Sequence, residues 1–69
     1  MNQRINILTQ ILTENGECVF PHNTYAVKIE EGCAADYIYN LYESNGSCFD
    51  GGEYDGKAKD VISWIISNC

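Results

Sequence analysis

The sequence predicts an α+β fold with the element order α-β-β-β-β-α, in which a small antiparallel sheet of three to four strands follows one helix and precedes another. Three observations support this prediction. Apolar residues recur at helical spacing near both ends of the chain, they alternate with polar residues in the middle, and an Asn-Gly pair separates two aromatic segments. An antiparallel sheet needs cover on only one face, so we expect both helices to pack on the same face.

The first helix is predicted over residues 2–15. Its apolar stripe recurs at helical spacing, with Ile7 widening it: Ile5, Leu8, Ile11 and Leu12. Asn15-Gly16 provides a left-handed stop at the C-terminal end, because both residue types tolerate positive φ.

Two short strands are predicted next. Residues 17–20 form the first, and Pro21 ends it because proline has no N–H to donate to a central ladder. His22-Asn23 makes a turn. Residues 24–30 then alternate as a half-buried strand does, with Tyr25, Val27 and Ile29 on one side.

A hairpin over residues 36–50 is predicted to be the centre of the sheet. Asn45-Gly46 favours a two-residue type I′ turn, which requires positive φ at both positions. This register pairs Ser44 with Ser47, Glu43 with Cys48 and Tyr42 with Phe49. It divides the side chains between two faces, with Ile38, Tyr42 and Phe49 on one and Tyr37, Tyr39, Leu41 and Cys48 on the other.

The second helix is predicted over residues 56–68, after a flexible loop at residues 51–56. Asp55 is the candidate N-cap, because its carboxylate accepts from the free amides of a first turn. The face predicted to pack on the sheet has helical spacing, with Ile66 beside it: Ala58, Val61, Ile62, Ile65 and Cys69. Trp64 lies outside that stripe.

Length and charge restrict the function. The 69 residues predict a single domain, residues 1–69, which leaves no room for a deep catalytic cleft. Ten acids against four bases give a net charge of −6, which disfavours direct contact with nucleic acid or lipid headgroups and favours basic partners. Residues 1–6 lack the apolar run of a signal peptide and no segment resembles a membrane span, so we expect a cytoplasmic protein.

No pattern in the sequence predicts an enzyme, a cofactor or a metal site. The four cysteines are too widely spaced for a zinc site. In the cytoplasm we expect them to be reduced, with Cys18, Cys33 and Cys48 as small apolar fillers. The sequence leaves open whether any two of the cysteines form a disulfide. His22 is the only imidazole available to activate a thiol, and it lies in a turn. The acidic segment 50–56 does not have the spacing of a calcium loop, and the glycines do not form a phosphate-binding loop.

Aromatic and acidic side chains predict a binding surface instead, although the tyrosines equally suit completion of a small core. Acids would replace phosphates electrostatically while aromatics anchor the contact, and the candidate contact residues are Glu30, Glu31, Asp36, Tyr37, Tyr39, Glu43, Asp50, Glu53, Asp55 and Trp64.

In size and charge the chain resembles small accessory proteins of phages and mobile elements, including anti-CRISPR and anti-restriction inhibitors. That resemblance implies stoichiometric inhibition through a basic, nucleic-acid-binding surface of a host protein. The alternative is a self-associating structural or adaptor protein, with a homodimer formed through the open sheet face. A small Cys/His metal or thiol protein ranks last.

Overall fold

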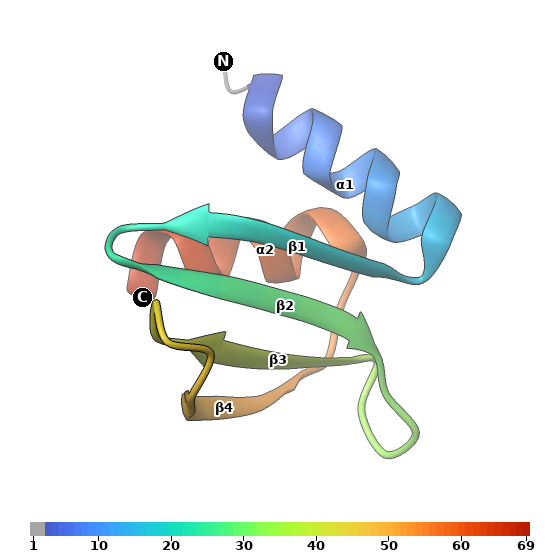
Figure 1. The fold of residues 1–69 in the computed structure, drawn as a ribbon. Helices are drawn as coiled ribbons and strands as arrows, with labels where there is room; N and C mark the ends of the chain where they lie inside the picture. Colours follow the sequence, from blue (N-terminus) through green and yellow to red (C-terminus); the bar gives the residue numbers. More distant parts are fainter. Residues whose placement is uncertain (1–2) are drawn as a thin grey trace.

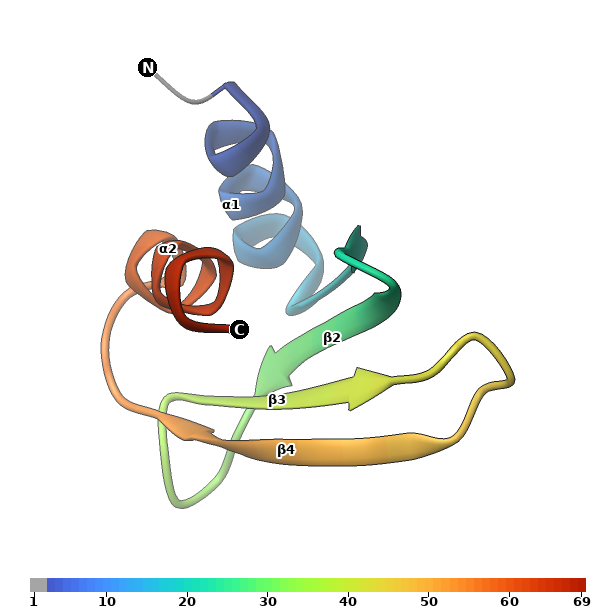
Figure 2. The same cartoon turned by 90° about the vertical axis from the view of Figure 1, so that its left-hand side faces the viewer.

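The computed structural model describes residues 3–69. The elements are α1 (Gln3–Asn15), β1 (Glu17–His22), β2 (Tyr25–Glu31), β3 (Tyr37–Tyr42), β4 (Cys48–Tyr54) and α2 (Ala58–Asn68). The strands form one antiparallel sheet in the order β1-β2-β3-β4, and both helices lie on the same side of it (Figures 1 and 2). The predicted α-β-β-β-β-α fold is confirmed. Asn2, the first residue of the predicted helix, lies outside the described residues.

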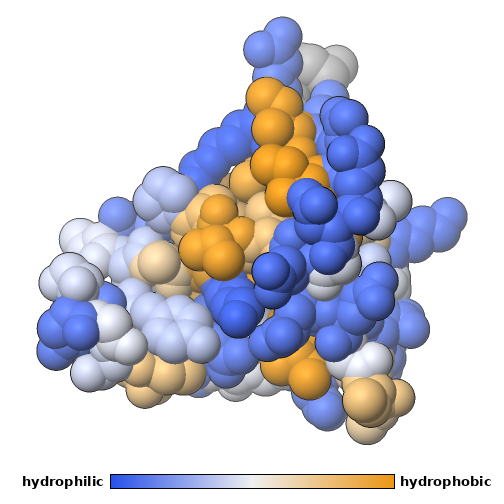
Figure 3. Space-filling model, turned by 45° about the vertical axis from the view of Figure 1, so that its right-hand side comes forward, coloured by the Kyte–Doolittle hydropathy of each residue, from blue (hydrophilic) through white to orange (hydrophobic). Residues whose placement is uncertain are grey.

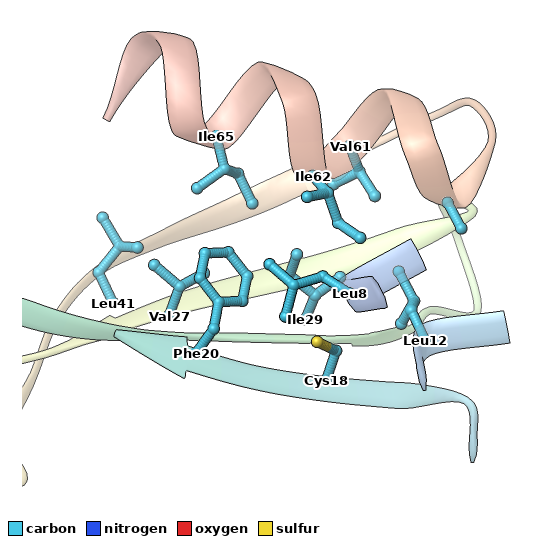
Figure 4. Packing of buried hydrophobic residues seen from close by; sticks show 11 residues of the cluster. Leu8, Leu12, Cys18, Phe20, Val27, Ile29, Leu41, Val61, Ile62 and Ile65 are labelled. Carbon is cyan, nitrogen blue, oxygen red and sulfur yellow. The ribbon is translucent and has the colours of Figure 1, made fainter. Parts of the chain in front are cut away.

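The core lies between the sheet and the two helices (Figure 4). The predicted stripe of α2 is confirmed, because Val61, Ile62 and Ile65 are fully buried. The strands contribute Cys18, Phe20, Val27, Ile29 and Leu41, and α1 contributes Leu8 and Leu12.

The stripe of α1 is narrower than the sequence predicts. Ile7 is 57% exposed and Ile11 is 38% exposed, whereas Leu8 and Leu12 are buried. The physical reason is that α1 packs against α2 and β1 along one side and rises away from the sheet, as Figure 2 shows.

Of the sequence signals around β1, the glycine before the strand acts as predicted and the proline within it does not. Gly16 has a φ of 78° and donates its N–H to the Leu12 carbonyl at 2.9 Å, which is the expected left-handed stop of α1. The prediction that Pro21 ends this strand is wrong, because β1 continues through Pro21 to His22 as an edge strand, which tolerates proline, and the turn lies at Asn23-Thr24. Arg4 of α1 donates to the Pro21 carbonyl and places its guanidinium 5.5 Å from the centre of the Phe20 ring, so α1 covers this edge of the sheet.

The turn of the central hairpin differs from the prediction. Gly46 has a φ of 90°, but Asn45 does not adopt positive φ, so a type I′ turn is wrong. Gly46 N–H donates to the Glu43 carbonyl and Glu43 N–H donates to the Ser47 carbonyl, both at 2.8 Å. This is the pattern of a three-residue loop, a type I turn followed by a left-handed glycine. The Asn45 side chain accepts the Ser47 N–H at 2.9 Å, which supports this loop.

The longer loop changes the register of the hairpin. Tyr42 pairs with Cys48 instead of Phe49, and a bulge places Asp50 opposite Leu41. Cys48 therefore shares a face with Tyr42, and the predicted faces of Cys48 and Phe49 are both wrong. The Phe49 ring lies 5.3 Å from that of Tyr25, at the helix-covered side. The remaining assignments hold, because Ile38 and Tyr42 share the open face while Tyr37, Tyr39 and Leu41 face the helices.

Gly46→Ala should lower the free energy of unfolding by about 1 kcal/mol, because a Cβ is strained at positive φ. Space is not the issue, since no atom lies within 4 Å of the position that an added Cβ would take. Urea denaturation measures the loss. Gly46→Asn is the control, since asparagine tolerates this conformation, and equal losses for both variants would contradict the role of backbone strain.

The segment before α2 also departs from the prediction. Residues 51–54, expected in a loop, belong to β4, and α2 begins at Ala58 rather than Gly56. Asp55 is not its N-cap, because that position is Lys57, which makes no side-chain cap bond. Asp55 Oδ1 instead accepts the Asp36 N–H at 3.1 Å, and Asp36 Oδ2 accepts the Gly56 N–H at 2.9 Å. These two bonds join the β2–β3 loop to the segment between β4 and α2.

Candidate partner-binding surface

The open face of the sheet carries three glutamates in one row across its four strands, with Ile38 at the β3 position. Glu17 lies opposite Glu30, Glu30 opposite Ile38, and Ile38 opposite Glu53. The next row places a single cation, Lys28, between Val19 and Asn40. Like charges on directly opposite residues destabilise a sheet, so the Glu17–Glu30 pair does not contribute to the stability of the fold.

Further acids lie at the same end of the sheet. We define the acidic end as Glu17, Glu30, Glu31, Asp36, Glu53 and Asp55, which are six of the ten acids in the chain. A hollow of about 460 Å³ opens there between the β2–β3 loop and Gly56. Among residues 3–69 the structure records no ion pair to these carboxylates. Their charge is therefore available to a partner.

Aromatic side chains lie on the helix-covered side of the sheet, between α2 and the β3–β4 pair, and they meet the acidic end where Tyr37 pairs with Glu31. The Trp64 ring lies 5.6 Å from Tyr39 and 5.7 Å from Tyr54, and Tyr54 pairs across the sheet with Tyr37. We call these four residues the aromatic cluster. Trp64 remains 37% exposed, which agrees with its predicted position off the buried stripe.

Two tyrosines of the cluster, Tyr37 and Tyr39, have raised pKa values. Burial raises the pKa of Tyr37, and the carboxylates of Glu31 and Asp36 raise it further. Burial likewise raises the pKa of Tyr39, with Cys69 and Asp50 adding to the effect. Both phenols therefore stay protonated at neutral pH and can donate hydrogen bonds to a partner.

The structure gathers most of the predicted contact residues and separates two. Glu30, Glu31, Asp36, Glu53 and Asp55 lie at the acidic end, and Tyr37, Tyr39 and Trp64 belong to the aromatic cluster. Asp50 lies further along β4, opposite Leu41. Glu43 lies in the hairpin turn beside a separate hollow lined by Tyr25 and Phe49, so it does not join the others.

Sequence reasoning missed Glu17 and Tyr54. The register of β1 against β2 would have placed Glu17 opposite Glu30. Tyr54 was hidden because Gly51-Gly52 suggests a loop, whereas the structure continues β4 through both glycines. The Tyr39 ring lies over Gly52, where a Cβ would come within 2.7 Å of the Tyr39 Oη. The neighbouring aromatic thus replaces the missing side chain.

All four cysteines are free, but only one is the apolar filler that the sequence predicts. Cys18 is buried, whereas Cys33 and Cys48 are exposed and Cys69 is half-buried. The expectation is therefore wrong for Cys33 and Cys48, because one lies in the β2–β3 loop and the other faces away from the helices. Among residues 3–69, no group of three or more His, Cys, Asp or Glu side chains is placed to hold a metal ion.

Thiol reactivity should follow this burial. Cys33 and Cys48 should react with a thiol reagent in the folded protein, followed more slowly by Cys69. Burial raises the pKa of Cys18, and burial together with Asp50 raises that of Cys69, so both hold less thiolate at a given pH and react more slowly. Absorbance during labelling, before and after unfolding in urea without reductant, measures this. Fewer than four reactive thiols after unfolding would reveal a disulfide.

Within residues 3–69, no helix has the length and apolar character needed to cross a membrane. Comparison of the chain with protein-family models, with curated proteins and with solved structures gives no match.

Proposed function

We propose that this protein is a non-enzymatic binding protein that occludes a basic, nucleic-acid-binding surface of a host protein. The observation that supports this is the acidic end, six carboxylates without an ion pair among the described residues. It meets the aromatic cluster at the Glu31–Tyr37 pair, whereas Glu17, Glu30 and Glu53 lie on the opposite face of the sheet. The two groups of residues supply the two components of a competitive inhibitor, charge that replaces phosphate and rigid area that holds the complex together.

Each component acts on a different rate. Exposed carboxylates attract a lysine- and arginine-rich site from a distance and raise the association rate. Aromatic side chains bury a large rigid area and still offer a polar group, so they slow dissociation. Host nucleic-acid-binding enzymes such as CRISPR complexes and restriction enzymes carry basic surfaces of this kind, which places the proposed activity in the cytoplasm.

Affinity capture from nuclease-treated host lysate tests the proposal. The immobilised wild-type protein should retain a nucleic-acid-binding protein, and adding the soluble protein should block nucleic-acid binding by that partner at a stoichiometric ratio. A triple variant, Glu17→Gln/Glu30→Gln/Glu53→Gln, should lose the capture.

Loss of capture by the triple variant should not result from unfolding, because the three substitutions remove charge repulsion within one row of the sheet. The variant should therefore be no less stable than wild type. Urea denaturation checks this. Capture of the same proteins by wild type and the triple variant, or a captured partner that still binds nucleic acid, would overturn the proposal.

Salt should weaken the complex, mainly through the association rate. Exposed charge pairs are screened once the Debye length falls to about 8 Å at physiological ionic strength. Glu30→Gln should lower both the affinity and its dependence on salt. The matched change Glu43→Gln, in the β3–β4 turn at the opposite end of the sheet, should leave both unchanged. Kinetics measured over a salt series report each effect. Affinity independent of salt would exclude phosphate mimicry.

Self-association is the second candidate, and one observation favours it. Hydrophobic side chains gather on the surface along α1 (Figure 3), where Ile7 is 57% and Ile11 38% exposed, and Val19 on the open face of β1 is 63% exposed. Such apolar surface suits a contact between copies. Light scattering over a concentration series distinguishes the candidates: a monomer fits the inhibitor, and a dimer dispersed by Val19→Asp fits self-association through the open sheet face.

A further inference from the structure

The β4 edge of the sheet is open. Among residues 3–69, no element lies beyond β4 in either view of the ribbon (Figures 1 and 2), and β4 is the last strand of the sheet. The opposite edge differs, because Arg4 of α1 bonds to the Pro21 carbonyl of β1. An uncovered edge strand offers unpaired backbone groups to another chain.

The hydrogen-bond pattern identifies which groups of β4 face outward. Glu43 N–H donates to Ser47, so this pair is a bonded pair, and bonded and non-bonded pairs then alternate along β3. The alternation makes Tyr39 a bonded partner of Gly52, while Asn40–Gly51 and Ile38–Glu53 are non-bonded pairs. Gly51 and Glu53 therefore turn their N–H and C=O groups away from β3, towards the open edge.

A side-chain contact supports this assignment independently. Gly51 N–H donates to Asp50 Oδ1 at 2.8 Å, which fits an amide that is not engaged with β3. The Asp50 carboxylate covers the outward N–H of Gly51, and it can rotate away about its side-chain bonds. An incoming strand can displace it, so Asp50 shields the edge without closing it.

We propose that the β4 edge binds an extended segment of the partner, rich in lysine and arginine, as a fifth strand of the sheet. This inference rests on the proposed function and specifies how the basic partner is recognised. Acids flank both faces of the added strand, because Asp50 shares the face of Leu41 and Glu53 shares that of Ile38. Backbone bonds would supply affinity and the flanking acids would select basic side chains.

Gly52 gives the aromatic cluster a part in this recognition. Since Gly52 has no side chain and the hydroxyl end of the Tyr39 ring lies over it, a partner residue beside Gly52 would meet the Tyr39 Oη. A lysine or arginine placed there would donate to the Tyr39 Oη while its aliphatic stem packs along the ring.

A second copy of this chain fits the edge poorly. Two β4 strands can pair only through their outward backbone groups, at Gly51 and Glu53, and antiparallel pairing centred on Glu53 would place the Glu53 carboxylates of the two copies directly opposite each other. Like charges directly opposite destabilise strand pairing. The charge of the edge therefore selects a basic partner segment over self-pairing.

Two synthetic peptides test the inference on the full chain. The first is a short peptide in which Lys or Arg alternates with Thr or Val, and the second has the same sequence with alternate backbone nitrogens methylated. Both carry the same charge, but the second cannot form a strand ladder. We expect the first to bind and to slow hydrogen exchange at the Gly51 and Glu53 amides, and the second to bind roughly tenfold more weakly or worse.

Two variants at one position separate backbone pairing from charge. Glu53→Gln removes the charge alone, whereas Glu53→Pro also removes an outward N–H that the β3–β4 ladder does not use. We expect Glu53→Pro to bind the first peptide several-fold more weakly than Glu53→Gln does, with urea denaturation confirming that both fold. If Glu53→Pro does not fold, the comparison of the two peptides still decides.

Equal binding of the two peptides, or of the two folded variants, would mean that charge acts without strand pairing, which overturns the edge inference and leaves the proposed function standing. No binding of the first peptide also overturns the edge inference. The proposed function is tested separately, by the lysate capture with the wild-type protein and the triple variant.

Discussion

Replacing Ile65 with alanine is expected to lower the free energy of unfolding by about 2–5 kcal/mol. Ile65 is fully buried between α2 and the sheet (Figure 4), so the change removes apolar contact and leaves a cavity. A domain of this size buries only about 60% of its unfolded surface and has little stability to spare. Urea denaturation followed by circular dichroism should show a large fall in the midpoint, or a protein unfolded in buffer.

Ile7→Ala is the matched control, since it makes the same chemical change in a helix at a residue that is 57% exposed. We expect a change within about 0.5 kcal/mol. Equal losses at the two positions would contradict the placement of the core between α2 and the sheet, and would mean that the faces of the helices are assigned wrongly.

Trp64→Ala is expected to speed dissociation of the partner by about 30-fold, which corresponds to about 2 kcal/mol. Trp64 is exposed enough to meet a partner and is held in place by the rings of Tyr39 and Tyr54. Truncation removes a rigid apolar anchor, so the effect belongs to the dissociation rate rather than to association. Surface plasmon resonance with the captured host protein measures both rates.

The same ring contacts revise the expected effect of Trp64→Ala on folding. From its position off the buried stripe, the sequence predicts little loss of stability, but the loss of contacts with two tyrosines should cost about 1 kcal/mol. Trp64→Phe, which keeps an aromatic ring, is the control and should retain most of both the binding and the stability. Unfolding of Trp64→Ala in buffer, or an unchanged dissociation rate in a folded variant, would refute the anchor.

The acids of the binding surface show how far residue type leads without tertiary structure. Their sign and number already predict a basic partner, because net charge does not depend on the fold. The grouping of these acids on the surface does depend on the fold. Glu30 and Glu53 lie far apart in sequence and flank Ile38 only through strand pairing. Glu43 lies in the turn at the other end of β3, so it is distant from both.

The sequence by itself determined the element order and the buried face of α2, because helical spacing and strand alternation are local patterns that survive in the folded chain. Tertiary structure decided the rest. The hairpin loop follows the bonds available to Asn45, β4 passes through two glycines because Tyr39 covers one of them, and Ile7 stays exposed because α1 rises from the sheet. Each outcome depends on neighbours distant in sequence or on local bonding alternatives, which periodicity does not resolve.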